Sequence, residues 1–249
     1  FGKKENEHEN VKYINDDLEN IHDINEPIDL CFHLAAKARV QPSFNDPVDY
    51  FRVNAKGTME VMEWAKKNNV KVVYAGSSSK HFSPEDSPYA MYKYLGELVI
   101  KLYKKSFDVK AEIARFYNVY GPRENIDEKF GNVIGIWSAK IKKNQPLPIV
   151  GDGKQRRDFI HVYDLVDGLI KIAESDISHN DAWELGSGVN YSVIDLFNFF
   201  NNKYDIESIH IPDQPGNYRK TLRTNDDTLK LLNWNPKDRL KSHIDNLNI

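Results

Sequence analysis

The stretch VKVVYAGSSSKHFSPEDSPYAMYKYLGELVIKLYKKSFDVKAEIARFYNVYG, residues 70–121, holds two apolar runs on either side of a long amphipathic segment. The runs at 70–76 and 109–121 have the length and apolar content of buried strands. Between them, residues 87–106 follow a helical pattern, opened by Ser87 with Pro88 at the first helical position. A strand, a helix and a strand in this order predict a right-handed crossover between two parallel strands.

The segments before this stretch continue the same alternation. The runs VKYI (12–15) and IDLCFHLAA (28–36) predict two further strands. Residues 46–69 predict an amphipathic helix, in which Pro47 follows the capping residue Asp46. The fold class is therefore α/β, a Rossmann-like parallel sheet with helices on both faces.

The pattern changes after Gly121-Pro122. We expect a helix around 131–143, a turn at GDGK (151–154), a strand at DFIHV (158–162) and helices at 163–174 and 192–202. This part predicts a smaller α/β lobe that is interleaved with the sheet domain. We expect the sheet domain to comprise residues 1–124 and 155–190, and the lobe to comprise residues 125–154 and 191–249.

Composition narrows the possible partners. Lys and Arg number 34 against 37 Asp and Glu, a net charge of −3 that offers no basic field for nucleic acid. No apolar run approaches the roughly 20 residues that cross a bilayer, so we expect no membrane partner. The single cysteine, Cys31, can form no internal disulfide, which favours the cytoplasm.

The chain begins with FGKKENEHEN, which contains no initiator Met and no apolar leader. We interpret this stretch as a surface loop entered midway, and we expect the natural N-terminus to lie upstream.

The best candidate for chemistry combines serines 77–79, at the end of a predicted strand, with Tyr89 and Lys93 on the next helix. Residues i and i+4 share one face of a helix. A nearby lysine ammonium favours the phenolate, so we expect Lys93 to lower the pKa of Tyr89. Ligands bind at the carboxyl ends of strands in open α/β sheets, which favours a catalytic Ser77, Tyr89 and Lys93.

With these residues the chain resembles the extended short-chain dehydrogenase/reductase proteins, specifically the NAD-dependent nucleotide-sugar epimerases and dehydratases. The matching pieces occur in the family's order, from about residue 12 to the end of the chain. They are Asp17-Leu18, Phe32-His33-Leu34-Ala35-Ala36, Ser43 with Pro47, Asn54-x-x-Gly57-Thr58, serines 77–79, Tyr89-x-x-x-Lys93, residues 115–123 (RFYNVYGPR), Gly151-Asp152-Gly153, residues 157–162 (RDFIHV) with Asp164, and Gln214-Pro215-Gly216.

The resemblance implies NAD as cofactor and assigns residues to it. Asp17, followed by Leu18, matches the aspartate that hydrogen-bonds the adenine amino group, and Asn54 matches a residue that orders the site beneath the nicotinamide. Phe116 lies where the family backs the nicotinamide. By the same resemblance, Tyr89 and Lys93 would contact the cofactor as well as act in catalysis. Leu34, Ala35 and Ala36 match a stretch of the family that packs close to the cofactor.

The resemblance also implies a nucleotide-sugar substrate, with a UDP-linked sugar favoured by Gln214-Pro215-Gly216. Asn118 matches a residue that reaches the diphosphate or the sugar, and Arg157 matches an arginine that clamps the diphosphate. Asn132 and Val133 resemble the pair that binds the nucleotide, and Ser78 lies beside the sugar.

The residues after Ser77 indicate which reaction follows the shared oxidation step. Related 4,6-dehydratases carry an Asp-Glu pair where this chain has Ser78 and Ser79, and 4-decarboxylases carry a glutamate in the place of Ser79. Without these acids, the expected outcome is return of hydride to the opposite face of the 4-keto sugar. The resemblance therefore implies a 4-epimerase acting on a UDP-hexose or a UDP-uronate.

Two departures leave other functions open. The family's Gly-x-x-Gly-x-x-Gly fingerprint is absent from the sequence, so we expect the first βαβ unit to be missing. Lys80-His81-Phe82 replaces the usual Val-Tyr-Gly, which indicates a different sugar pocket. The alternatives are a dehydratase or reductase of the same family, and a non-catalytic protein that binds NAD or a nucleotide sugar.

Relatives commonly pair through the helices matched by residues 46–69 and 87–106. We therefore expect a homodimer. Apolar residues of these two helices would supply the contact, and some of them must face their own sheet instead: Met59, Met62, Tyr94, Leu98 and Leu102.

Overall fold

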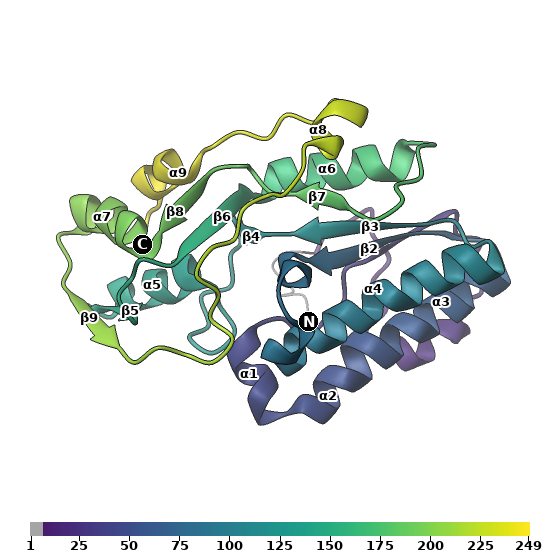
Figure 1. The fold of residues 1–249 in the computed structure, drawn as a ribbon, viewed down its shortest axis with the longest axis horizontal. Helices are drawn as coiled ribbons and strands as arrows, with labels where there is room; N and C mark the ends of the chain where they lie inside the picture. Colours follow the sequence, from purple (N-terminus) through teal and green to yellow (C-terminus); the bar gives the residue numbers. More distant parts are fainter. Residues whose placement is uncertain (1–6) are drawn as a thin grey trace.

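The computed structural model describes residues 7–249, and its central element is a four-stranded parallel sheet (Figure 1). The strands lie in the order β1 (Leu30–His33), β2 (Lys71–Ser77), β3 (Ala111–Phe116) and β7 (Trp183–Leu185). Their register pairs Leu30 with Lys71, Val72 with Ala111 and Ala114 with Trp183. The predicted α/β class and parallel sheet are confirmed.

Helices cover both faces of this sheet, as predicted. Helices α3 (Gly57–Asn68) and α4 (Pro88–Phe107) lie against one face, and α6 (Val162–Glu174) lies against the other (Figure 1). Met62, Tyr74 and Ile100 belong to the core on the first face, and Ile160 and Trp183 belong to the core on the second. The side chain of Ser87 caps α4 by accepting a hydrogen bond from the Ala90 amide (3.1 Å), and Pro88 follows at the first position.

The predicted helix at 46–69 is one helical run with a local irregularity. It consists of α2 (Pro47–Phe51), the π-helical segment η3 (Arg52–Lys56) and α3. Shorter helical pieces frame the strand ends: η2 (Leu18–Asp23), α1 (Val40–Asn45), η4 (Ser78–His81) and η5 (Pro84–Asp86).

The rest of the chain builds two smaller sheets and a third core. Strands β4 (Asn118–Tyr120) and β6 (Arg156–His161) pair in parallel, and β8 (Asn190–Ser192) joins β6 in the antiparallel direction. A parallel pair is formed by β5 (Leu147–Val150) and β9 (Ser208–Ile211). The accompanying helices are α5 (Val133–Lys142), α7 (Val193–Tyr204), α8 (Asp227–Leu231) and α9 (Leu240–Asn246).

Three strand predictions need correction. Residues 12–15 form no strand, because Val11, Tyr13 and Ile14 are half exposed and pair with no strand among residues 7–249. The predicted strand at 28–36 is limited to β1. The predicted strand at 109–121 is two strands, β3 and β4, which belong to different sheets.

None of the helices in residues 7–249 has the length and apolar content needed to cross a membrane.

Candidate active site

The candidate site lies where β2 ends and the chain turns into η4. Ser77 is the last residue of β2, and its hydroxyl accepts a hydrogen bond from the Ser79 amide (3.2 Å), which caps η4. This cap holds serines 77, 78 and 79 at the carboxyl edge of the sheet, where all three are buried. The edge is the one at which open parallel sheets bind ligands.

The first turn of α4 brings Tyr89 to these serines. The Tyr89 hydroxyl donates to the Ser77 hydroxyl at 3.4 Å, and the Ser79 hydroxyl donates to the same oxygen at 2.9 Å. The Tyr89 amide donates to the Ser43 hydroxyl (3.1 Å), so α1 helps to fix the start of α4. The predicted pairing of Ser77 with Tyr89 is therefore present in the geometry.

Lys93 lies one turn further along α4 and is buried, with 5% of its surface exposed. Its ammonium donates to the Ala75 carbonyl and lies 4.5 Å from the centroid of the Tyr74 ring. Burial lowers the pKa of Lys93 to about 8, although the Glu97 carboxylate acts in the opposite direction.

The expected effect of Lys93 on Tyr89 is not found. Burial raises the pKa of Tyr89 above its ordinary value, and the opposing contributions come from the Ser77 hydrogen bond and the charge of Arg39. The prediction that Lys93 lowers this pKa was wrong, because the ammonium bonds Ala75 on β2. Arg39, whose Nε donates to the Phe130 carbonyl (2.9 Å), supplies the positive charge instead.

The end of β1 presents the residues matched to the cofactor. Leu34 and Ala35 are exposed, and Ala36 is partly buried. Asn54 is buried in η3, where its side chain accepts from the Lys37 amide (2.8 Å) and donates to the Lys37 carbonyl (2.9 Å). Asn54 therefore fixes the backbone that follows β1.

The other residues matched to the cofactor lie in different surroundings. The Asp17 carboxylate caps η2 and accepts from Arg52 (3.0 Å), which lowers its pKa. Leu18 packs against the core beneath α3, and Phe116 packs against the core under α6. Within residues 7–249, no hydrogen bond or ion pair joins Asp17, Leu18 or Phe116 to Tyr89.

Two of the residues matched to the substrate, Arg157 and Asn118, contact a C-terminal segment, residues 217–221. Arg157 donates to the Tyr218 carbonyl (2.6 Å) and to the Asn217 side chain (2.5 Å), and burial lowers its pKa to about 10. Asn118 donates to the Asp158 carbonyl (3.1 Å) and lies 3.5 Å from the Thr221 hydroxyl.

Asn132 and Val133 lie at the start of α5. The Asn132 side chain accepts from the Gly135 amide (3.0 Å) and donates to the Val119 carbonyl (2.8 Å). Asn132 is therefore the N-cap of this helix, and Val133 is its first residue. Asn132 therefore stabilises the start of α5, a structural role that the resemblance did not imply.

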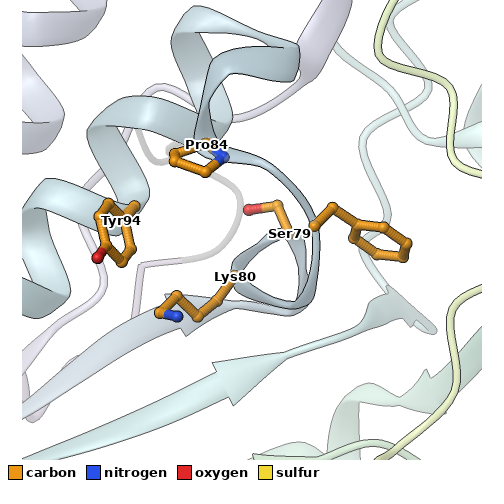
Figure 2. Close-up of a pocket in the computed structure, with 5 residues that line it drawn as sticks. Ser79, Lys80, Pro84 and Tyr94 are labelled. Atoms are coloured by element: carbon orange, nitrogen blue, oxygen red, sulfur yellow. The ribbon is translucent and has the colours of Figure 1, made fainter.

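An aromatic contact joins the strand-end loop to the C-terminal segment. The rings of Phe82 and Tyr218 stack with centroids 3.8 Å apart and an interplanar angle of 8°. Phe82 also lines a cavity of about 110 Å³, together with Ser79, Lys80, Pro84 and Tyr94 (Figure 2). Ligand sites in proteins are usually several times larger than this cavity.

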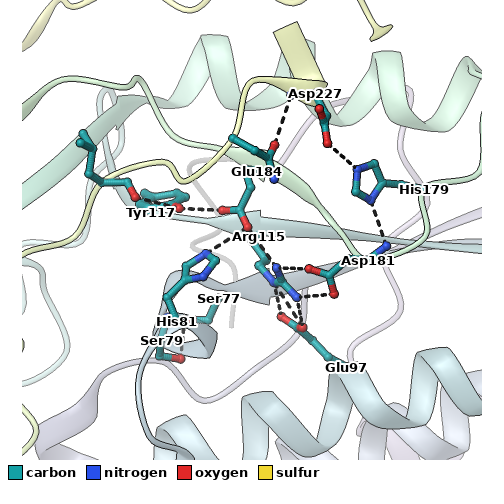
Figure 3. Close-up of polar contacts among 12 residues, drawn as sticks. Ser77, Ser79, His81, Glu97, Arg115, Tyr117, His179, Asp181, Glu184 and Asp227 are labelled. Carbon is teal, nitrogen blue, oxygen red and sulfur yellow. Dashed lines mark hydrogen bonds and ion pairs between the residues drawn. The ribbon is translucent and has the colours of Figure 1, made fainter. Parts of the chain in front are cut away.

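A largely buried network of charges, which the sequence patterns did not predict, lies beside the serines (Figure 3). Arg115 on β3 pairs with Glu97 of α4 (2.8 Å), Glu184 of β7 (3.0 Å) and Asp181 (2.7 Å). Glu184 also accepts from Tyr117 (2.6 Å) and His81 (3.0 Å). The signal in the sequence was a glutamate inside an apolar strand, since a buried charge needs partners.

Comparison with known proteins supplies the family. Residues 3–186 match the model of the NAD dependent epimerase/dehydratase family. The chain belongs to this family. A protein of Methanocaldococcus jannaschii that is provisionally named UDP-glucose 4-epimerase is 31% identical over 98% of this chain and 85% of its own length.

Two further relatives of this epimerase/dehydratase chain are an epimerase of known structure and a plant decarboxylase. The UDP-glucose 4-epimerase of Thermotoga maritima, solved with UDP-glucose, superposes with a TM-score of 0.89 at 25% identity, over 98% of this chain and 85% of its own. UDP-glucuronic acid decarboxylase 2 of Arabidopsis thaliana is 30% identical over 90% of this chain. The chain spans only 54% of the length of that plant enzyme.

The residues at the β1 edge fit NAD, the cofactor of this family. The small, uncharged surface of Leu34, Ala35 and Ala36 permits close approach of a flat group. Within residues 7–249, the ammonium of the buried Lys93 forms one hydrogen bond, to the Ala75 carbonyl, which leaves N–H donors for ribose hydroxyls.

Proposed function

We propose that the protein catalyses the 4-epimerisation of a UDP-linked sugar, and that Ser77, Tyr89 and Lys93 carry the proton transfer. The observation that carries this proposal is the contact between the Tyr89 and Ser77 hydroxyls, with Lys93 one turn away at the same sheet edge. The family and its UDP-glucose 4-epimerase relatives support the reaction class.

The residues of the chain provide a route for the proton. Ser77 would hold the O4 hydroxyl of the sugar, and the Tyr89 oxygen would take its proton as the C4–O4 bond becomes a carbonyl. NAD, when bound, accepts the C4 hydride and later returns it. The 4-keto sugar rotates within the site, so that the hydride returns to its opposite face, and Tyr89 gives the proton back to O4. Atoms and electrons therefore balance without another reactant.

Two groups near Tyr89 favour the phenolate form that a proton carrier needs, although burial leaves the pKa of Tyr89 above its ordinary value. The charge of Arg39 and the Ser77 hydrogen bond both favour the phenolate, against the effect of burial. Burial lowers the pKa of Lys93 to about 8. We propose that Lys93 also donates to the ribose hydroxyls of the cofactor.

The serines after Ser77 support epimerisation over elimination. Ser78 and Ser79 are buried at the positions where a dehydratase needs acids, and a serine hydroxyl is too weak an acid to protonate a leaving hydroxide. The Ser79 hydroxyl is committed to Ser77, which further suits it to a positioning role.

We also propose the finer assignments that follow from the family. Asp17, Leu18, Leu34, Ala35, Ala36, Asn54 and Phe116 would contact NAD, and Ser78, Asn118, Asn132, Val133 and Arg157 would contact the UDP-sugar. The sheet domain and substrate lobe would divide as expected from the sequence, and the protein would act as a cytoplasmic homodimer.

Tyr89→Phe tests the proposal, because it removes one oxygen from the site. We expect turnover to fall by at least about a thousandfold, while the affinity for UDP changes little. Ser106→Ala, a small change at an exposed position of the same helix, is the control. Substantial epimerase activity in Tyr89→Phe would remove this tyrosine from the mechanism.

A further inference from the structure

The Tyr218 hydroxyl is buried and has no hydrogen-bond partner within residues 7–249. Two other unpartnered groups, the Tyr74 hydroxyl and the Trp64 indole N–H, lie in the hydrophobic core beneath α3 and α4. Tyr218 belongs to none of the three hydrophobic cores of the described chain. A buried hydroxyl without a partner costs free energy, and a bound ligand that accepts its hydrogen bond would recover that free energy.

The chain segment that carries Tyr218 crosses the start of α4. Gly216 has a φ of +69°, and a Cβ on this residue would lie 3.2 Å from the Asp86 carbonyl oxygen and 3.5 Å from the Ser87 Cβ. Ser87 is the N-cap of α4, and Tyr89 lies in the first turn of that helix. The backbone of this segment therefore brings Tyr218 to the part of α4 that carries the proposed proton carrier.

Tyr218 is held at its ring and at its backbone. The ring stacks on Phe82, as described above, and the backbone carbonyl accepts from Arg157 (2.6 Å). Phe82 also lines a second cavity, of about 340 Å³, together with Ser78 and Thr221. This volume lies in the range of small-molecule sites. The stack therefore fixes the phenol against a wall residue of a cavity that is large enough for a sugar.

The charges around the Tyr218 hydroxyl place it near both ends of the proposed substrate. Burial, together with the charges of Asp86 and Tyr89, raises the pKa of Tyr218 to about 12, against the charge of Arg157. The phenol therefore keeps its proton at neutral pH and can donate a hydrogen bond. Tyr89 is the residue proposed to exchange the O4 proton, and Arg157 is the residue proposed to contact the diphosphate.

We propose that the Tyr218 hydroxyl donates a hydrogen bond to a sugar oxygen of the bound UDP-sugar. The inference rests on the proposed function, because Ser77 and Tyr89 place one end of the sugar and Arg157 places the diphosphate at the other. The sugar between these two ends then passes the Tyr218 hydroxyl. Phe82 takes the place of a glycine in the family's usual Val-Tyr-Gly, so the ring that holds Tyr218 belongs to a departure of this chain from the family.

Tyr218→Phe tests the inference, because it removes only the hydroxyl and keeps the stacked ring. Calorimetric titration of the full-length protein with UDP, UDP-glucose and UDP-glucuronate measures the effect, in a Tyr89→Phe background that prevents turnover. We expect the affinity for each UDP-sugar that binds to fall about tenfold, since one hydrogen bond is lost. The affinity for UDP should change less than about twofold.

The stability of the variant separates a ligand contact from a structural contact. The midpoint of urea unfolding of Tyr218→Phe should stay the same or rise, because the substitution removes a buried oxygen that has no partner in the described chain. The matched control is Tyr163→Phe, which removes the same atom from a ring that packs on His161 (centroids 5.0 Å apart), away from the lining of both cavities. Its affinities for all three ligands should be unchanged.

An unchanged affinity for the UDP-sugars in Tyr218→Phe would overturn the inference and leave the proposed function intact. An equal loss of affinity for UDP and the UDP-sugars would assign the hydroxyl to the diphosphate and would also overturn it. A lower urea midpoint would show that the hydroxyl has a partner within the protein, with the same consequence. Failure of both the parent protein and Tyr89→Phe to bind any UDP-sugar would overturn the proposed function together with the inference.

Discussion

At the level of single residues, the spacing of Tyr89 and Lys93 pointed to the candidate site, but the direction of the Lys93 side chain could not be predicted from spacing. The Ser77 and Tyr89 hydroxyls meet because a strand end and a helix start converge at the sheet edge, which the order of elements predicted. The Lys93 ammonium bonds a carbonyl of β2, and that contact depends on how deeply α4 packs against the sheet. Sequence patterns carry no information about that depth.

Burial of the Lys93 ammonium also lowers the free energy of unfolding by an amount that can be measured. Its pKa of about 8, against an ordinary value of 10.5, means that the buried site disfavours the charged form by roughly 3 kcal/mol below pH 8. Lys93→Met removes this penalty but leaves the Ala75 carbonyl unbonded, at a cost of about 1 kcal/mol. We expect the variant to be about 2 kcal/mol more stable at pH 7 and inactive.

The difference in stability between Lys93→Met and the parent protein should also depend on pH. Between pH 8 and 10.5 the unfolded chain holds more protons on Lys93 than the folded one, so this residue makes the parent protein gain stability as pH rises. The advantage of Lys93→Met should therefore shrink over that interval. Urea unfolding at pH 7 and pH 9.5 measures it, and a constant or reversed difference would show that the lysine is not strained by burial.

At the level of elements, α4 and β2 approach each other closely at Gly96. A Cβ there would lie 2.2 Å from the Tyr74 hydroxyl and 3.3 Å from the Asn54 carbonyl. The Tyr74 ring is buried and Asn54 is held in η3, so neither can move away easily. This contact explains a helical glycine that sequence propensity alone disfavours.

Gly96→Ala should therefore destabilise the protein by about 1–3 kcal/mol, although alanine is the better helix former. The midpoint of urea unfolding measures the change, with Ser106→Ala on the same helix as the control, expected within about 0.5 kcal/mol of the parent. A Gly96→Ala protein as stable as the parent would mean that α4 does not pack this closely on Tyr74.

The predicted strand at 109–121 is in fact two strands, and the sequence pattern did not show where one ends and the next begins. Its apolar run is continuous, but β3 pairs with β2 and β7, while β4 pairs with β6. Tyr117 lies at the break, with its hydroxyl on Glu184. A local pattern predicts that residues are extended, but the neighbour of each strand is decided by contacts far along the chain.

At the level of the whole molecule, the exposed apolar residues of α3 and α4 support the proposed dimer. Met59, Leu98 and Leu102 are 44%, 42% and 48% exposed, whereas Met62 is buried in the core. Met62 is therefore one of the five candidate contact residues that face their own sheet. The remaining apolar residues lie on the two neighbouring helices that cover one face of the sheet (Figure 1).

Charges on this face should separate the subunits. We expect Leu98→Glu combined with Leu102→Glu to halve the mass found by light scattering at micromolar concentration, because a pair of buried carboxylates is costly. Ile177→Glu, at an exposed apolar position after α6, is the control and should leave the mass unchanged. A parent protein that is already monomeric would refute the dimer.

The proposed reaction is tested most directly by identifying the product. The full-length protein is incubated with NAD and a pure UDP-sugar, UDP-glucuronate first and UDP-glucose second, and the mixture is followed by NMR and mass spectrometry. We predict that signals of the C4 epimer grow to a constant ratio, with unchanged mass and no net consumption of NAD. Loss of water or of carbon dioxide from the sugar, or accumulation of NADH in proportion to product, would contradict 4-epimerisation.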